Sequence, residues 1–273
     1  MFNERTRQDT VFKTESALST SYSPPEPIDR TAEIEQIAQA VQPLSRGQPP
    51  ENILVHGPAG SGKTTAIEYV LERLEKQTST KSVHINCIQY NTRSSLLCQL
   101  LIELGYPVPR KGKAVDELLE KLLEWLNKNR SAVLALEEFD QLQDQTEIVY
   151  DLHETSKQAT NHLGLILASN SDPRDILMDP RSQSRLNYRR VAFDPYTKNE
   201  LYEILRERAK TAFQPGCVSD DALALIAGRV AEQRGDCRHA IELLHRAGRI
   251  ADRDNSKTVR SEHAKRSFNP ART

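Results

Sequence analysis

The segment from Gly57 to Thr64 carries residue types that bind phosphate groups. It contains a glycine, four further residues and Gly-Lys-Thr, which is the Walker A pattern. Glycines let the main chain curl so that its N–H groups point at phosphate oxygens, and a helix starting near Lys63 adds its positive end. We expect Lys63 to reach the β- and γ-phosphates of a nucleotide and the Thr64 hydroxyl to bind Mg²⁺. The predicted nucleotide-binding residues of this loop are Gly57, Pro58, Ala59, Gly60, Ser61, Gly62, Lys63, Thr64 and Thr65.

A second group of chemically active residues follows the apolar run 132–136. It contains Glu137, Glu138 and Asp140. In the Walker B pattern the first acid holds magnesium and the second polarises the attacking water. We therefore predict that Glu137 binds Mg²⁺ and that Glu138 is the general base. Glu137 occupies a place where aspartate is usual, so the additional methylene predicts altered metal geometry and slow turnover. The alternative is that these acids only end a strand and begin a loop.

Asn170 follows another apolar run and is the third candidate for chemistry. An amide at the end of a strand beside the Walker B strand can hold the attacking water or sense the γ-phosphate. The alternative is a turn, since Asn170, Ser171 and Asp172 are turn-forming residues.

The elements that position these residues alternate between short apolar strands and amphipathic helices. Strands are expected at 52–56, 82–87, 132–136, 164–169 and 188–193, and helices at 31–41, 63–76, 96–104, 115–127 and 147–158. Continuously apolar strands separated by helices predict a parallel sheet covered on both faces. After Pro195 the pattern changes to helices alone, at 198–212, 220–233, 236–253 and 261–267. The predicted fold is a three-layer α/β/α core with five parallel strands over 24–195, an all-helical domain over 196–273, and a mobile tail over 1–23.

The composition fits a globular protein and narrows the kinds of partner. Of 273 residues 37% are hydrophobic and 27% charged, with a formal net charge of -1. Contact with DNA would therefore depend on local basic patches and not on bulk charge. The four cysteines form no CxxC pair, so no zinc site or disulfide framework is predicted. Neither a signal peptide nor an apolar run long enough to span a bilayer is present, which predicts a cytoplasmic, nucleoid-associated protein without a membrane partner.

Several segments together resemble the archaeal and eukaryotic origin-recognition and cell-division-cycle initiators, which are AAA+ proteins that mark replication origins. The similarity runs from about residue 22 to about residue 251. The segments that carry it are 23–30, 52–65, 86–125, 137–142, 179–186, 193–196 and 235–240. The resemblance implies ATP or ADP and Mg²⁺ as cofactors, a helical lid over 196–273, and an initiator-specific helical insertion near 88–128.

The resemblance also implies roles for residues outside the P-loop. Ile28, Arg30 and Tyr196 would contact the nucleotide around the adenine. Arg238 would reach the γ-phosphate as the second sensor. Arg185, with Arg181 as second choice, would be an arginine finger for a neighbouring subunit's ATP, because a guanidinium stabilises charge on the transferred phosphoryl group. A surface ion pair is the alternative for each of these arginines.

A basic loop in the insertion is the candidate DNA contact. The resemblance implies that Arg110, Lys111 and Lys113 neutralise DNA phosphates, which adds affinity without sequence choice. The alternative is an ordinary solvated loop. Other AAA+ subunits or a replicative helicase are further partners that the resemblance implies.

Family members usually continue into a winged-helix domain that reads DNA, for which we expect no room before Thr273. The sequence thus favours an ATP-switched initiator or helicase-loading ATPase. It leaves two alternatives, an AAA+ regulator outside replication of a transposition or partner-recruiting type, and a nucleotide-dependent binding module that hardly hydrolyses ATP.

Overall fold

A computed structural model describes residues 10–19, 22–109, 112–174 and 188–269. The chain divides into two compact units. The sheet unit comprises Arg30–Pro58 and Lys63–Phe193, and the helical unit comprises Met1–Asp29, Ala59–Gly62 and Asp194–Thr273.

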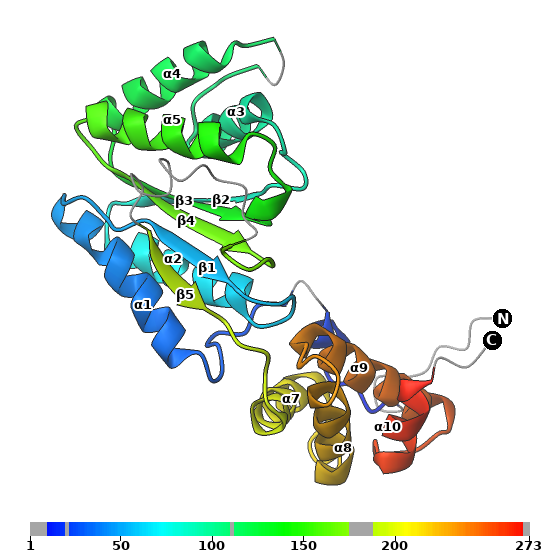
Figure 1. Ribbon diagram of the computed structural model, residues 1–273. Helices are drawn as coiled ribbons and strands as arrows, with labels where there is room; N and C mark the ends of the chain where they lie inside the picture. The colour runs from blue at the N-terminus through cyan, green and yellow to red at the C-terminus, as the bar shows by residue number, and fades with distance from the viewer. Residues whose placement is uncertain (1–9, 20–21, 110–111, 175–187, 270–273) are drawn as a thin grey trace. The chain divides into compact units, whose positions relative to one another are not determined.

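The sheet unit is built on parallel strands whose carboxyl ends meet at one edge. Within the described residues there are five, in the order β2-β3-β4-β1-β5 (Figure 1). Their bounds are β1 Ile53–His56, β2 Lys81–Asn86, β3 Ala132–Glu137, β4 Leu163–Ser169 and β5 Arg189–Ala192. The central strands β3 and β4 are almost continuously buried, as expected of parallel strands covered on both faces. The predicted α/β fold with five parallel strands is confirmed.

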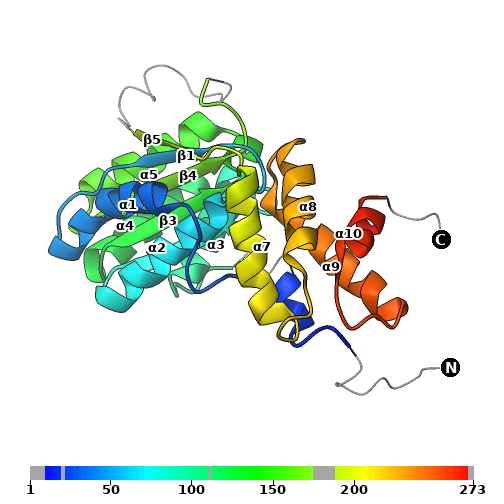
Figure 2. The same ribbon diagram turned by 90° about the horizontal axis from the view of Figure 1, so that it is seen from below.

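Helices cover both faces of this sheet, and the strand residues alternate between them. Their bounds are α1 Thr31–Val41, α2 Lys63–Gln77, α3 Arg93–Glu103, α4 Val115–Lys128 and α5 Gln145–Gln158. Val133 and Ala135 of β3 pack with α1 and α2, whereas Leu134 and Leu136 pack with α3, α4 and α5. The two helical layers are seen in Figure 1, and Figure 2 looks from the side of α1 and α2.

Helix α3 begins three residues earlier than predicted. Thr92 precedes it with an extended backbone, and its hydroxyl accepts the N–H of Ser95 at 3.3 Å. A capped first turn needs no apolar residue, so the apolar pattern that starts at Leu96 marks the beginning of the buried face and not the beginning of the helix.

The helical unit packs four longer helices around its own core. They are α7 Lys198–Ala212, α8 Asp220–Ala231, α9 Cys237–Arg253 and α10 Ser261–Phe268. Thr197, Ser219 and Asp236 accept main-chain N–H groups at the first turns of α7, α8 and α9, which satisfies donors that the helices leave free. None of the helices within the described ranges is long and apolar enough to cross a bilayer.

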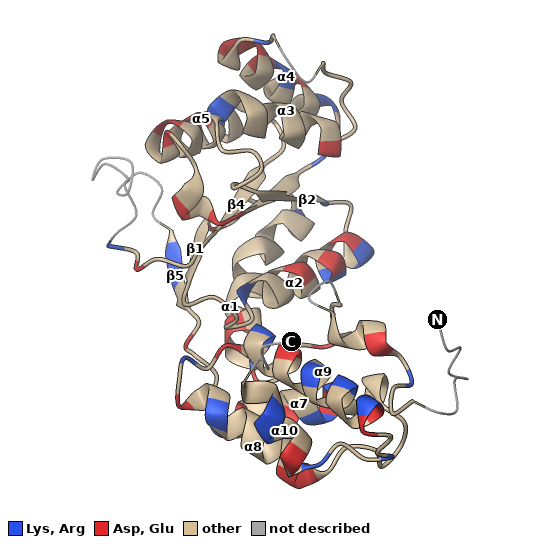
Figure 3. Ribbon diagram, turned by 90° about the vertical axis from the view of Figure 1, so that its right-hand side faces the viewer, with Lys and Arg blue, Asp and Glu red and all other residues tan. Residues whose placement is uncertain are grey.

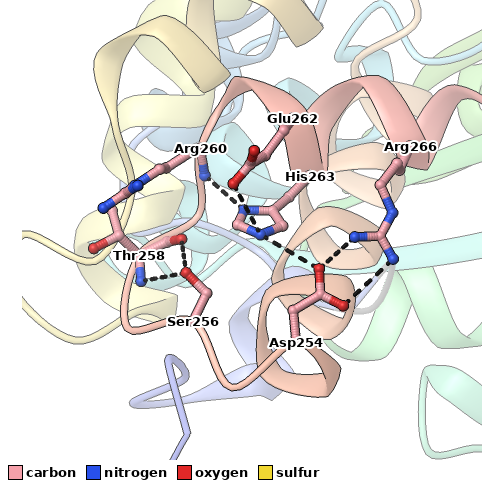
Figure 4. A network of polar contacts seen from close by, with 7 residues as sticks. All are labelled: Asp254, Ser256, Thr258, Arg260, Glu262, His263 and Arg266. Carbon is pink, nitrogen blue, oxygen red and sulfur yellow. Dashed lines mark hydrogen bonds and ion pairs between the residues drawn. The ribbon is translucent and has the colours of Figure 1, made fainter.

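A polar network joins the turn after α9 to α10 (Figure 4). Nδ1 of the buried His263 accepts the N–H of Arg260 at 2.9 Å, and its Nε2 lies 3.7 Å from Asp254. Asp254 also accepts a hydrogen bond from Arg266, which lowers the pKa of this carboxyl. The network ties the first turn of α10 to the end of α9.

Residues 10–19, which fall within the tail predicted to be mobile, pack against the helical unit, and we call them the N-terminal strap. Val11, Phe12, Ala17 and Leu18 are buried in the core of the helical unit. The main-chain N–H of Val11 donates to Asp252 at 2.8 Å. The tail is polar on average, so its composition did not reveal that these four apolar residues are buried. Their burial stabilises the packed position of the segment.

Candidate functional site

The glycines of the P-loop stand where a side chain would collide. Gly57 has a φ of 150°, and a Cβ there would lie 2.1 Å from the carbonyl oxygen of Phe193. Gly60 has a φ of 73°, and its Cβ would lie 1.8 Å from Oδ1 of Asp236. Both positions require glycine on backbone and steric grounds, so the loop conformation and its sequence agree.

Lys63 is the first residue of α2 and is almost completely buried. Its ammonium Nζ donates to the carbonyl oxygens of Gly57 at 2.7 Å and of Pro58 at 2.9 Å. It also donates to Oδ1 of Asn170 at 2.8 Å. The fold thus brings the lysine of the P-loop and the predicted sensor amide together, although 107 residues separate them in the sequence.

Asn170 links this lysine to the acids that follow β3. Its Nδ2 donates to Oε2 of Glu138. Its main-chain N–H donates to Oδ1 of Asp140 at 3.3 Å, and the hydroxyl of Ser169 donates to the same oxygen at 2.8 Å. Burial opposes ionisation of Asp140, but hydrogen bonds from Gln141, Ser169 and the main chain lower its pKa overall. Asp140 therefore anchors the end of β4 as an ionised acceptor.

Glu138 leaves the strand in an unusual backbone conformation. Its φ of 51° and ψ of 43° lie in the left-handed region, which costs a non-glycine residue roughly 1–2 kcal/mol. The turn directs the main chain into the short helix Phe139–Gln141, whose Phe139 is fully buried. A carboxylate and an amide at adjacent strand ends are suited to holding a water molecule between them.

Glu137, the predicted metal ligand, is paired with a histidine that sequence reasoning missed. Oε1 of Glu137 lies 3.3 Å from Nε2 of His84 on β2. Burial alone would lower the pKa of His84, but the nearby carboxylates of Glu137 and Glu68 raise it. The available signal was weak, because polar residues at alternate positions of an edge strand are common.

The oxygen donors of this region suit a magnesium ion that arrives with a nucleotide. Mg²⁺ prefers hard oxygen ligands and is usually held by one or two carboxylates, phosphates and water. Glu137 supplies a carboxylate and Thr64 a hydroxyl. Within the described part of the chain no three His, Cys, Asp or Glu residues are grouped as a complete metal cage. Burial and the charges of Asp140, Glu138 and Glu137 raise the pKa of the Cys87 thiol to about 12.

Arg238 lies at the start of α9, within the helical unit. Asp236 accepts the N–H of Arg238 at 2.8 Å, and the N–H of Cys237 donates to the carbonyl oxygen of Gly60 at 3.1 Å. The exposed Arg238 thus directly follows the residue that contacts the tip of the P-loop.

The three residues predicted around the adenine fall into both units. Ile28 and Tyr196 pack in the same hydrophobic cluster of the helical unit, and the N–H of Tyr196 donates to Gly235 at 3.2 Å. Arg30 belongs to the sheet unit, where its guanidinium bonds Glu33 at 3.0 Å and lies 5.5 Å from the centre of the Phe193 ring. The carbonyl oxygen of Phe193 also lies where a Cβ at Gly57 would be. Phe193 was not predicted as a site residue.

The described residues include only part of the other predicted sites. Arg181 and Arg185, the arginine-finger candidates, and Arg110 and Lys111 of the basic loop lie outside them. Lys113 is described, and its ammonium donates to Glu117 at 2.6 Å.

Comparison with known proteins tests the resemblance independently of these contacts. Residues 26–167 match the AAA ATPase domain family, and residues 202–269 match the Cdc6 AAA+ ATPase-type lid domain. The chain is 32% identical over 276 residues to the ORC1-type DNA replication protein of Pyrococcus furiosus, covering 96% of this chain and 66% of that protein. It therefore spans just under two thirds of that relative's length.

Solved structures give the same result. The Aeropyrum pernix ORC1 protein in complex with DNA superposes with a TM-score of 0.85 at 31% identity, covering 94% of this chain and 69% of that one. Cdc6p from Pyrobaculum aerophilum superposes with a TM-score of 0.85 at 25% identity, covering 94% and 71%. With two matched family domains and this likeness to known ORC1 and Cdc6 proteins, the chain belongs to the ORC1/Cdc6-type AAA+ ATPases.

Proposed function

We propose that this chain binds ATP with Mg²⁺ at its P-loop, hydrolyses it slowly, and uses the bound nucleotide to control DNA engagement in replication initiation. The observation that carries this proposal is the connected set Lys63, Asn170 and Glu138, in which Lys63 begins the helix after β1 and the other two directly follow β4 and β3. These are the groups that phosphate binding, sensing and water activation require, and they come from three separate segments.

Nucleotide binding would exchange the partners of Lys63. Its ammonium is held by two carbonyl oxygens and an amide oxygen, none of which carries a formal charge. Phosphate oxygens offer stronger, charge-assisted hydrogen bonds to the same ammonium. The main-chain N–H groups of 57–65 and the first turn of α2 add further donors. When bound, Mg²⁺ neutralises charge on the β- and γ-phosphates, with Thr64 and Glu137 as its protein ligands.

Hydrolysis would require Glu138 to accept a proton from the attacking water. Its carboxylate is engaged by the amide of Asn170, so it must exchange that contact, at least in part, for the water. Asn170 then holds the water or the γ-phosphate. This exchange, together with the longer acid at Glu137, supports slow turnover, and Arg238 with Arg185 from a neighbouring subunit would stabilise the charge that develops.

DNA contact is proposed from the relative whose structure is a complex with DNA, the A. pernix ORC1 protein. The net charge of -1 and the mixture of both signs along α2 (Figure 3) favour local contacts over a broad basic face. Arg110, Lys111 and Lys113 are the proposed contacts. Lys113 would exchange Glu117 for a phosphate, and since this pair lies near the surface, the exchange costs little.

A binding module with little turnover is the second candidate, and the hydrogen bond that holds Glu138 to Asn170 favours it. Single-turnover hydrolysis with and without DNA separates the two functions. A measurable rate that DNA or a partner subunit increases supports the ATPase, and no rate under any of these conditions supports the module.

A titration of duplex DNA with ATP, with ADP and without nucleotide, at two salt concentrations, tests the proposal. We expect affinity to depend on the nucleotide. Replacing Arg110, Lys111 and Lys113 by alanine should reduce the slope of log affinity against log salt by about 0.9 for each lost phosphate contact. The matched control replaces Lys76, Lys128 and Lys157, each paired with a glutamate of its own helix. Equal losses in both triple variants, or affinity independent of nucleotide, would contradict the proposal.

A further inference from the structure

His84 lies on the face of the sheet that carries the P-loop helix. On β2, Val83 and Ile85 are buried toward α3 and α4. His84, between them, therefore points to the opposite face, toward α2. On β3 the residues directed to that face are Val133 and Ala135, and the alternation continues to Glu137.

The two nitrogens of His84 face carboxylates from two different elements. Nε2 lies 3.3 Å from Oε1 of Glu137, and Nδ1 lies 3.8 Å from Oε1 of Glu68. Glu68 follows Thr64 by four residues on α2, so the two occupy the same helical face. A chain of side chains thus extends from the P-loop helix through β2 to the carboxylate that ends β3.

The register of the sheet explains why this contact needs a long acid. Glu137 pairs directly with Asn86, and His84 pairs with Ala135, so His84 is the diagonal neighbour of Glu137. Diagonal neighbours on one face are within reach only of long side chains. The side chain of Asn86 is directed elsewhere, since its Oδ1 accepts the N–H of Ile88 at 2.9 Å. An aspartate at 137 would be shorter by about 1.5 Å and would not reach the imidazole at this spacing.

We propose that His84 is a positioning residue, which holds the Glu137 carboxylate in place for the magnesium ion of the nucleotide site. Glu137 and His84 form a matched pair, in which the histidine fixes the rotamer that the additional methylene would otherwise leave free. Glu68 orients the imidazole through its other nitrogen. Groups that orient a metal ligand typically change metal affinity by 10- to 100-fold when they are removed. This inference rests on the proposed nucleotide site.

The test measures how strongly Mg²⁺ strengthens binding of ADPNP, a non-hydrolysable ATP analogue. For His84→Ala we expect about tenfold weaker apparent affinity for Mg²⁺ in the ADPNP complex, with ADPNP affinity in EDTA unchanged. Electron paramagnetic resonance of bound Mn²⁺ reports the same loss without any turnover. Ser82→Ala, on the same strand and two residues before His84, is the matched control and should leave both affinities unchanged. His84→Gln retains a hydrogen-bond donor and should therefore keep part of the Mg²⁺ affinity that His84→Ala loses. It also replaces His84→Ala in the test if the alanine variant does not fold.

A double-mutant cycle isolates the pair. In Glu137→Asp, which cannot reach the imidazole, the further change His84→Ala should alter Mg²⁺ affinity by less than twofold. An equal loss in both backgrounds, or an unchanged or higher Mg²⁺ affinity in His84→Ala, overturns the inference. If the unmodified chain binds ADPNP but gains nothing from Mg²⁺, the inference fails and nucleotide binding stands. If it binds no ADPNP in either condition, the proposed function fails as well.

Discussion

Charges are balanced differently around Lys63 and in the N-terminal strap. The ammonium of Lys63 donates to three oxygens without formal charge, two of them in the main chain. In the strap the carboxylate of Glu15 meets Nε2 of His245 at 2.7 Å and Nε of Arg249 at 2.9 Å. Oxygens without formal charge thus contact the ammonium at the proposed nucleotide site, whereas basic side chains compensate the carboxylate in the strap.

The two regions also differ in how apolar contacts support them. Phe12 of the strap packs against Phe213 with ring centroids 4.8 Å apart, and a Cβ at Gly248 would lie 2.5 Å from its ring. At the proposed nucleotide site Glu138 and Asn170 directly follow strands, and the strands behind them, β3 and β4, are buried. We therefore expect the strap to contribute stability and the strand ends to contribute nucleotide binding, so substitutions in the two regions should have separable effects.

Glu138→Gln should give the largest effect of these variants, and the effect should be on the rate of ATP hydrolysis alone. Removing a general base lowers the rate by roughly 10²- to 10⁴-fold, so single-turnover ATP hydrolysis should fall at least 100-fold while nucleotide affinity changes little. Glu147→Gln, an exposed residue of α5, is the control. If turnover of Glu138→Gln equals that of the unmodified chain, another group is the base.

Phe12→Ala should destabilise the helical unit without affecting nucleotide binding. Truncating a buried phenylalanine costs about 3 kcal/mol of unfolding free energy, and Phe12 is 7% exposed. Urea unfolding followed by hydrogen exchange of α7 and α9 measures this loss. The half-exposed Tyr150, changed to alanine, is the control. A lowered nucleotide affinity in Phe12→Ala at full folding would show that the two regions are not separable.

Lys63→Ala should have the opposite effect to Phe12→Ala, since it should weaken nucleotide binding without destabilising the helical unit. Hydrogen bonds to a charged group contribute about 2 kcal/mol, so affinity for ATP should fall about 30-fold by calorimetry. Lys76→Ala lies on the same helix and is exposed, and it should bind as the unmodified chain does. Unchanged affinity in Lys63→Ala would remove the basis for the nucleotide site.

Glu15→Gln should give the smallest effect, and it should depend on pH. Burial opposes ionisation, but hydrogen bonds from His245 and Arg249 lower the pKa of Glu15 below its usual 4.5. A lowered folded-state pKa stabilises the fold above the unfolded value, and this contribution is lost as pH falls through the folded value. The thermal midpoint of Glu15→Gln should therefore lie below that of the unmodified chain at about pH 6 and approach it below about pH 4. Since Glu15 is 43% exposed, the difference should stay small. A difference that does not change with pH would contradict this account.

Local patterns in the sequence predicted the elements around the site. The P-loop glycines, the apolar run before Glu137 and the switch to helices after Pro195 each depend on residues close together in the chain. Element bounds were less well predicted, as at α3, because a cap such as Thr92 extends a helix beyond its apolar face.

The contacts that local patterns did not predict all join distant segments. The strap is held by Asp252, 241 residues after Val11, and by Arg208, 191 residues after Ala17. His84 meets Glu137 only because β2 and β3 are adjacent and in a particular register. No feature of β2 alone distinguishes this histidine from a solvated residue of an edge strand.

The strand-loop-helix of the Walker A pattern, the acids after β3 and the family could be read from the sequence, since these follow from residue types at fixed short spacings. The tertiary structure decided which of these groups touch. It joined Lys63 to Asn170 and Asn170 to Glu138, gave Glu137 a histidine partner, and buried the strap. Such pairings depend on strand order, register and packing, which arise from many weak long-range contacts and leave no short pattern in the chain.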